Sequence, residues 1–183
     1  SRGLGDVYKR QLFRLLQFNN LKPDERTRGL LRETIGRLPD IQYKGARGLD
    51  FSHCYPVESF DRRSVMWDLN YFKYCFLKIS GIEFDEAGLE DDFEHLADLI
   101  LDDSDSKPTF MYRDFQSRNV MIKENAPWFI DFQGGRRGPA LYDLASFLWQ
   151  ARAGFSHELR SELAAVYLES VQRYHHWEAD EFN

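Results

Sequence analysis

The sequence has very few cysteines, and this scarcity argues against some classes of protein. Cys54 and Cys75 are the only two in 183 residues, and neither belongs to a Cys-x-x-Cys pair or lies near clustered histidines. The spacing argues against a metal site built from thiolates. It favours a reduced, cytoplasmic setting in which both thiols are small core residues and not ligands.

Long apolar runs and an excess of basic residues are also missing from the sequence. A membrane-spanning helix needs about 20 mostly apolar residues in succession, and no run approaches that length. Asp and Glu number 30 against 24 Lys and Arg, which gives a formal net charge of −6. Broad binding to nucleic acid or to an anionic membrane needs a basic surface. We therefore expect no nucleic-acid partner and no membrane partner.

The chain does contain enough apolar material for a packed core. Hydrophobic residues make up 43% and aromatic residues 15% of the sequence, which is typical of a globular domain. The length of 183 residues corresponds to one domain. Residues 1–11 show no amphipathic period, so we interpret them as a non-native leader and residues 12–183 as the folded unit.

Apolar residues recur with helical spacing over much of the chain. The pattern predicts helix over residues 12–38, with Thr27 as an N-cap and Pro39 as the end, followed by an irregular connection or weak strand. A further helix is predicted over residues 58–79. Its expected inward face consists of Val65, Leu69, Phe72, Phe76 and Ile79.

The next predicted helix, over residues 86–101, lies in a strongly acidic segment. Between Glu83 and Asp105 there are eleven acidic residues and no Lys or Arg. We favour a solvated helix face for this segment. The alternative is an electronegative rim that attracts cationic substrates.

After Pro108 the apolar period changes to two, which is typical of strands. "TFMY" is predicted as a strand, and "VMIK" with "WFIDF" as a hairpin whose turn covers residues 124–126. "GGRRGPA" is predicted as a loop, and helices resume at Asp143 and Ser156. A mostly helical chain with a small central sheet is an α+β fold.

The stretch "FMYRDFQSRNVMI" interrupts two apolar runs with a dense group of polar residues. Asp114 and Asn119 share one loop there, and Asp131 follows the second strand of the predicted hairpin. A closed hairpin brings its ends together, so Asn119 and Asp131 should become neighbours. Their carboxamide and carboxylate oxygens suit Mg²⁺, which leaves Asp114 free to accept a proton.

The spacing of these residues matches a known template for phosphoryl transfer. Kinases carry H-R-D-x-x-x-x-N in the catalytic loop and D-F-G at the metal site. Here the chain has Tyr-Arg-Asp at 112–114, four residues, Asn119, and then Asp-Phe-Gln-Gly at 131–134. The pattern therefore predicts a site in which a carboxylate orients a hydroxyl beside a magnesium-bound nucleotide.

The run "YRDFQSRNVMI…FIDFQGGRRGPALYDLASFLW" is similar to the C-terminal lobe of the aminoglycoside phosphotransferase and choline kinase family, which has a protein-kinase-like fold. Within it the resemblance is nearest to bacterial sugar kinases that act on N-acetylmuramate or N-acetylglucosamine. The resemblance implies that Asp114 is the catalytic base and that Asn119 and Asp131 bind Mg²⁺. It also implies ATP and Mg²⁺ as cofactors and a sugar or amino sugar as the substrate.

Other polar residues near the motif have open or structural roles. Asp143, in "LYDLA", matches an Asp that braces the site in this family, and we favour that structural role. Arg113 and Arg118 either stabilise phosphate charge or tie down the carboxylates of the loop. We keep Arg118 as a candidate cofactor-binding residue.

The glycine-rich segment after the motif is less informative. Gln116 has no assigned role, and Arg136 and Arg137 either face an anionic ligand or belong to a solvated loop. We favour the solvated loop for both arginines.

The chain departs from the family pattern in two places. Tyr112 stands where the family usually has His, a residue that supports the loop. No glycine-rich strand-turn-strand with a following Lys occurs before residue 40, although these elements hold the nucleotide phosphates in kinases. We therefore expect this chain to be the C-terminal lobe alone, with the N-terminal nucleotide lobe of the same protein as its missing partner.

Two other functions fit parts of the pattern. A non-enzymatic binding or regulatory module with a decayed kinase lobe would keep the fold but lack the nucleotide lobe in the full gene. A Mg²⁺-dependent hydrolase using Asp114 and Asp131 is less well supported, because neither residue belongs to an Asp-x-Asp pair and no histidine cluster accompanies them.

Overall fold

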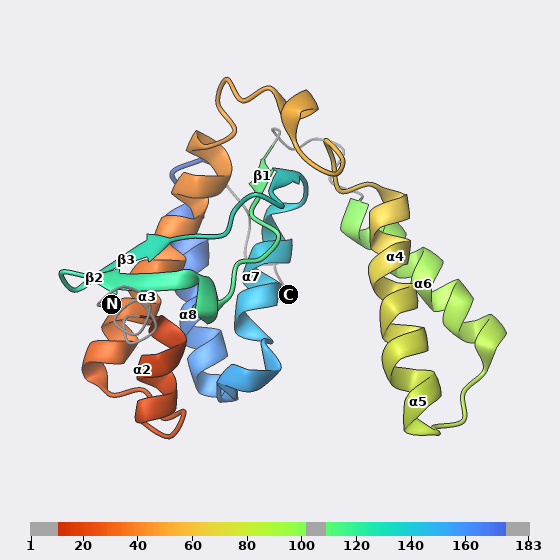
Figure 1. Ribbon diagram of the computed structural model, residues 1–183, viewed down its shortest axis with the longest axis horizontal. Helices are drawn as coiled ribbons and strands as arrows, with labels where there is room; N and C mark the ends of the chain where they lie inside the picture. Colours follow the sequence, from red (N-terminus) through yellow and green to blue (C-terminus); the bar gives the residue numbers. More distant parts are fainter. Residues whose placement is uncertain (1–10, 102–108, 175–183) are drawn as a thin grey trace, which may run out of the picture.

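A computed structural model describes residues 11–101 and 109–174 and shows a helical body from which a two-helix arm projects (Figure 1). Of the predicted leader, residues 1–10 lie outside this range, while Gln11 forms a β-bridge with Met121. Within the two described ranges, no helix is long and apolar enough to cross a lipid bilayer. The architecture is the mostly helical α+β fold that the sequence predicts.

The body is built around two long helices, α3 and α8, that lie side by side and run in the same direction (Figure 1). Their facing sides bury Leu31, Ile35, Leu163 and Tyr167, each 0% exposed. Shorter helices complete the body around this pair. The bounds of the four helices are α2 Leu12–Phe18, α3 Glu25–Pro39, α7 Ala140–Leu148 and α8 His157–Val171.

The N-caps of the two long helices are short polar side chains. Ser156 caps α8 by accepting a hydrogen bond from the Leu159 amide, as predicted. The cap of α3 is Asp24, whose carboxylate accepts from the Thr27 amide at 2.8 Å. The prediction of Thr27 as the cap is therefore wrong, since Thr27 is a buried residue of the first turn.

Pro39 does not end the helical path, contrary to the prediction. It is the last residue of α3, its φ of −60° is compatible with a helix, and a π-helical turn, η1 (Asp40–Lys44), follows directly. The predicted irregular segment is therefore helical in its first part. This turn places Gln42 in the interior at 0% exposed.

Two short antiparallel sheets lie against the body. Strands β2 (Val120–Lys123) and β3 (Ala126–Phe129) form the predicted hairpin, with a turn of two residues, Glu124 and Asn125. Both turn residues have positive φ values, 53° and 60°, as the tight hairpin turn requires. The hairpin is confirmed, with a turn one residue shorter than expected.

The second sheet pairs two segments that the sequence pattern treats differently. β1 (Phe110–Met111) is the predicted strand, and it pairs with β4 (Arg136–Arg137) in the segment predicted as a loop. The loop prediction is wrong at these two residues, because the register Met111↔Arg136 gives them strand partners. β4 thereby lies directly beside the strand that leads into the candidate catalytic loop.

The arm consists of two helical segments that contact each other along their length (Figure 1). The first begins at Arg62, not at residue 58, because Asp61 caps it by accepting from the Ser64 amide at 2.9 Å. Their bounds are α4 Arg62–Phe72, the π-helical turn η3 Lys73–Leu77, α5 Lys78–Ser80 and α6 Glu86–Leu101.

The inner face of the arm differs from the prediction for residues 58–79. Val65 is buried, but Phe72, Phe76 and Ile79 are 44%, 57% and 77% exposed. The π-helical turn rotates the helix surface, and Lys73 takes the inward position, where its ammonium pairs with carboxylates of α6. An ion pair between the buried Lys73 and two partly exposed glutamates thus replaces the expected apolar contact.

The acidic segment is largely a solvated helix face in the part that the structure describes. Arg62 pairs with Glu94 and Asp98 of α6, and Lys73 pairs with Glu90. These contacts neutralise part of the acidic charge within the arm itself and agree with the favoured interpretation. Residues 102–105 of the segment lie outside the described ranges.

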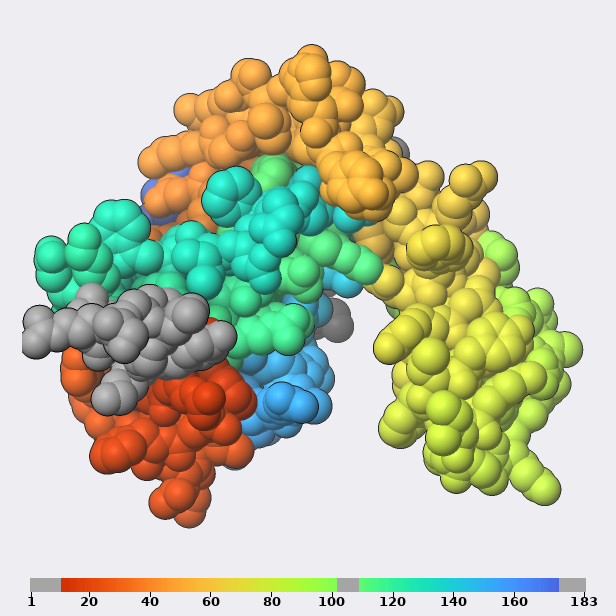
Figure 2. All heavy atoms as spheres, in the orientation of Figure 1, coloured from red at the N-terminus to blue at the C-terminus, as the bar shows by residue number. Residues whose placement is uncertain are grey.

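A small core joins the arm to the body. It contains Phe60, Val65, Ala97 and Met111, so it combines both arm helices with β1. Figure 2 shows an open recess between the rest of the arm and the body. The cysteine prediction is wrong for one thiol, because Cys75 lies exposed on the arm.

Candidate active site

The candidate catalytic loop runs from β1 to β2, and one buried carboxylate fixes its backbone. Asp143 of α7 is 0% exposed and accepts hydrogen bonds from the amides of Tyr112, at 2.8 Å, and Arg113, at 2.9 Å. Arg113 has a φ of 77°, a strained conformation for a non-glycine residue that surrounding contacts must hold in place. Asp143 supplies such contacts, so the proposed structural role of this residue agrees with its position.

The carboxylate of Asp143 is in turn held by a hydrogen-bond network that crosses the body. Gln42 donates to the Ala140 carbonyl at 2.7 Å and to Asp143 at 3.2 Å, and it accepts from the Tyr167 hydroxyl at 2.8 Å. Burial raises the pKa of Asp143 to about 7, although the donors around it act in the opposite direction. Sequence reasoning missed Gln42, because a single glutamine after a proline resembles a surface residue.

Asp114 follows in the same loop and is half-buried. Its backbone carbonyl accepts a hydrogen bond from the side-chain amide of Asn119 at 2.9 Å, which closes the loop on itself. Among the described residues, none forms a hydrogen bond or ion pair with the Asp114 carboxylate. The carboxylate is therefore available to a substrate hydroxyl.

The hairpin brings the two candidate metal ligands to one end. The Ile130 amide donates to the Asn119 carbonyl at 3.0 Å, which extends the pairing of β2 with β3 by one step. Asp131 follows Ile130 and therefore lies next to this pair. Because the side-chain nitrogen of Asn119 donates to the Asp114 carbonyl, the side-chain oxygen of Asn119 is available to bind a metal ion. Asp131 is exposed, with a φ of 73°. This donor set of two hard oxygens fits Mg²⁺, which commonly adds substrate phosphate oxygens and water.

Tyr112 links the segment that contains the candidate base Asp114 to the segment that contains the candidate metal ligand Asp131. The Tyr112 hydroxyl donates to the Ile130 carbonyl at 2.5 Å. Tyr112, which stands where the family usually has His, therefore holds the residue that precedes Asp131. Burial raises the pKa of Tyr112, and the charges of Asp131, Asp143 and Asp114 raise it further. The three carboxylates therefore gather around one ring.

The two arginines of the loop have different surroundings. Arg113 forms a two-pronged ion pair with Asp68 of α4, at 2.6 and 2.7 Å, and also donates to the Tyr142 hydroxyl. It thus ties the loop to the arm, which decides in favour of the structural alternative for this residue. Arg118 lies exposed in the short 3-10 turn η4 (Ser117–Asn119) and has no ion pair within the described part of the chain.

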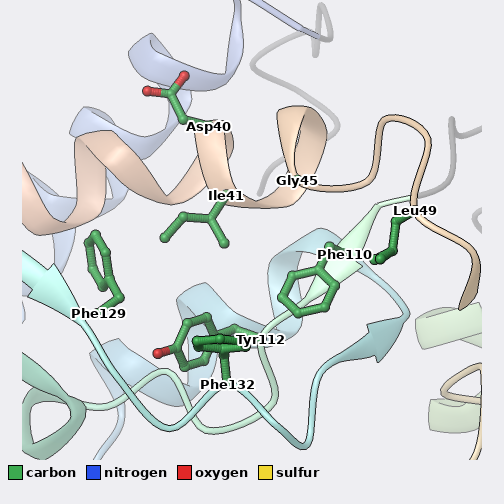
Figure 3. A pocket seen from close by; sticks show the side chains of 8 residues that line it. All are labelled: Asp40, Ile41, Gly45, Leu49, Phe110, Tyr112, Phe129 and Phe132. Atoms are coloured by element: carbon green, nitrogen blue, oxygen red, sulfur yellow. The ribbon is translucent and has the colours of Figure 1, made fainter. Parts of the chain in front are cut away.

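A cavity of about 510 Å³ opens beside the loop (Figure 3). Figure 3 shows Ile41 pointing from the helical side toward Tyr112 and Phe132. One wall is therefore made by the two segments that carry the candidate base and metal ligand. The cavity is mostly apolar and is lined by Asp40, Ile41, Gly45, Leu49, Phe110, Tyr112, Phe129 and Phe132.

Comparison with known proteins gives this geometry a context. The sequence pattern described as "Phosphotransferase enzyme family" matches residues 19–180. The chain belongs to this family. The family assignment expected from the motif is thereby confirmed.

Two curated relatives of this phosphotransferase-family chain are N-acetylmuramate/N-acetylglucosamine kinases. The one from Neisseria meningitidis serogroup B is 29% identical over 149 residues, which cover 79% of this chain and 42% of that protein. The one from Pseudomonas aeruginosa is 28% identical over 90 residues, covering 48% of this chain and 26% of that protein. The chain therefore matches less than half the length of either relative.

A solved structure shows the same fold. The choline kinase from Cryptosporidium parvum Iowa II superposes with a TM-score of 0.54 and 14% sequence identity, over 90% of this chain and 52% of that one. This likeness confirms the expected kinase-like lobe.

Proposed function

We propose that this chain is the catalytic lobe of an ATP- and Mg²⁺-dependent kinase that phosphorylates a hydroxyl group of a sugar or amino sugar. The observation that carries the proposal is the convergence of Asp114, Asn119 and Asp131 on one site, held by the buried carboxylate of Asp143. Membership of the phosphotransferase family supports it. ATP and Mg²⁺ make the cytoplasm the natural setting.

In this proposal Asp114 orients the acceptor hydroxyl and takes up its proton as the oxygen bonds to the terminal phosphorus of ATP, while the bond to the bridging oxygen breaks and ADP leaves. Asn119 and Asp131 would hold Mg²⁺, which offsets negative charge on the nucleotide phosphates when it is bound. Arg118, exposed beside Asn119, is positioned to pair with the nucleotide. Positioning and charge stabilisation make up most of the catalysis in this type of reaction.

The names of the two curated relatives support a proposal for the acceptor. Both curated relatives are named for N-acetylmuramate and N-acetylglucosamine, so we propose a related sugar hydroxyl as the acceptor. The recess between arm and body lies next to the loop, because Asp68 of the arm pairs with Arg113. A sugar in the recess would lie beside Asp114.

We further propose that an N-terminal lobe of the same protein completes the nucleotide site. The match to 42% of the Neisseria relative supports this arrangement. In kinases a glycine-rich loop and a lysine grip the phosphates, and the described residues contain no strand-turn-strand of that kind. We expect weak or no ATP turnover by the 183-residue chain alone.

The test is an ATP-consumption assay on the full-length protein with N-acetylmuramate, N-acetylglucosamine, choline and an aminoglycoside as acceptors. Turnover with a sugar would support the proposal, and Asp114→Asn should lower kcat by roughly 10²- to 10⁴-fold through loss of the base. Unchanged turnover in that variant would remove Asp114 from its proposed role. Binding of a sugar without any ATP turnover would instead support the binding-module alternative.

A further inference from the structure

Arg136 occupies an unusual position for an arginine in a segment predicted as a solvated loop. It is only 8% exposed. In β4 it pairs with Met111, and paired residues of an antiparallel ladder project to the same face. Met111 belongs to the small core at the base of the arm. Arg136 therefore lies inside the junction of arm, β1 and catalytic loop.

The backbone of β4 is fixed against β1 by close packing. A Cβ atom at Gly135 would lie 2.1 Å from the ring of Phe110, and one at Gly138 would lie 2.8 Å from the Met111 sulfur. A side chain at either position would therefore force the facing residue to move. The position of Arg136, between the two glycines, is therefore set by the fold and does not need a ligand to form.

The guanidinium of Arg136 has little to bind within the protein. Its Nε donates to the Gly134 carbonyl at 3.1 Å. In the part of the chain that the structure describes, no carboxylate forms an ion pair with it. Arginine has several N–H donors in a planar fork, so the outer nitrogens are left available. Charged side chains this deeply buried are normally paired.

The charge balance around Arg136 points to a missing anion. Burial lowers the pKa of Arg136, and the charge of Arg113 lowers it further. Asp68 lies close enough to oppose that effect, but both of its oxygens are bound by Arg113. Two guanidinium groups thus share one carboxylate. A second anion would balance this part of the site.

The neighbours of Arg136 indicate which anion would bind. Asp68, Arg113 and Tyr142 belong to the arm, the loop and α7, whereas the candidate metal ligands lie at the end of the β2–β3 hairpin. Arg113 directly precedes Asp114 in the sequence. The open partner position is therefore on the side of the arm and of the loop residue that precedes Asp114.

We propose that Arg136 binds a carboxylate on the acceptor, so that the site favours an anionic sugar over its neutral counterpart. The inference rests on the proposed kinase function and assigns its substrate class. N-acetylmuramate carries a carboxylate and N-acetylglucosamine carries none, so the two sugars named for the relatives form a matched pair of probes. A guanidinium fork matches a carboxylate in two-pronged geometry.

The experiment compares kcat/KM for the two sugars in the full-length protein. The wild type should prefer N-acetylmuramate, and Arg136→Gln should lower kcat/KM for that sugar by roughly 10- to 100-fold, with little change for N-acetylglucosamine. Arg137→Gln is the matched control, because it removes the same charge from an exposed residue whose guanidinium lies over Phe51. The control should leave the ratio of the two sugars unchanged.

Several results would overturn the inference. Equal losses for both sugars in Arg136→Gln would indicate a structural role, and a raised KM for ATP with both sugars would place the anion on the nucleotide. Arg136→Lys keeps a cation but loses the planar fork, so it should show an intermediate preference even if the glutamine variant does not fold. An unaltered preference in the lysine variant would also count against the inference.

The same measurements separate this inference from the proposed function. If the wild-type protein phosphorylates neither sugar, the kinase proposal fails. Calorimetric binding of both sugars would then test Arg136 by itself, with selective loss of N-acetylmuramate binding in Arg136→Gln as the expected result. If both sugars are phosphorylated and no variant changes their ratio, only the role of Arg136 fails.

Discussion

At the scale of single residues, the site depends most on Asp143. All the groups that face its carboxylate are donors: two loop amides and the side-chain nitrogen of Gln42. A side chain with two acceptor oxygens suits such surroundings. The strained backbone of Arg113 depends on these bonds.

Asp143→Asn is expected to destabilise the fold, since the new amide group would meet a donor and leave a buried N–H unpaired. The free energy of unfolding should fall by about 1–3 kcal/mol, measured by urea denaturation of the 183-residue chain. The control Asp92→Asn changes an exposed carboxylate on the arm and should have almost no effect. A change no larger than that of the control would contradict the bracing role.

The raised pKa of Asp143 also predicts a pH dependence of stability. Its pKa moves from 3.8 to about 7 on folding, so between these values the folded chain holds more protons than the unfolded chain. Stability then falls as the pH rises through this window. The wild type should lose stability relative to Asp143→Asn from pH 3.8 to about 7, as shown by urea titrations at several pH values. A constant difference would exclude this titration.

At the scale of elements, the contact between the loop and the arm has a positioning role. Arg113 joins β1 and the loop to Asp68 of α4 and to Tyr142 of α7. The side chain of Asp68 raises the pKa of Arg113. Both partners are partly exposed to solvent, so the pair contributes modestly to stability but defines where α4 lies against the loop.

Asp68→Asn should therefore affect the reaction more than the fold. We expect a loss of about 1 kcal/mol in the free energy of unfolding, together with a higher KM for the sugar and an unchanged KM for ATP in the full-length protein. Asp98→Asn is the control, because it breaks an exposed ion pair with Arg62 within the arm. Equal changes in both KM values would show that Asp68 does not act on the acceptor side.

Elements with a strong local period were predictable, and elements set by tertiary contacts were not. The period of two predicted the β2–β3 hairpin, and Ser156 predicted the start of α8. β4 was not predicted because two arginines between glycines resemble a surface loop, and only the structure shows that they pair with Phe110 and Met111.

Helical turns that depart from the usual spacing caused the other errors. The π-helical turn after Phe72 shifts the inward face to Lys73, and no sequence period signals that shift. Gln42 likewise enters the core only because a π-helical turn follows Pro39. The three candidate catalytic and metal-binding residues were predicted through their joint spacing, and their roles stay predictions. The sequence did not indicate all of the residues in the hydrogen-bond network of Asp143, Gln42 among them.

At the scale of the whole molecule, the catalytic loop lies at the meeting point of body and arm. The body supplies Asp143 and the hairpin, and the arm supplies Asp68. Figures 1 and 2 show that the arm leaves the body near β1 and α7. A change in the angle of the arm would therefore act first on Arg113 and through it on Asp114.

Tyr112 also affects how the charge at the candidate site depends on pH. A histidine in this place, as expected from the family, would change its charge near neutral pH, in the middle of three carboxylates. The phenol stays uncharged there because its pKa is raised, and its bond to the Ile130 carbonyl is kept. The hydrogen bond between the Tyr112 hydroxyl and the Ile130 carbonyl is thus independent of pH over the physiological range.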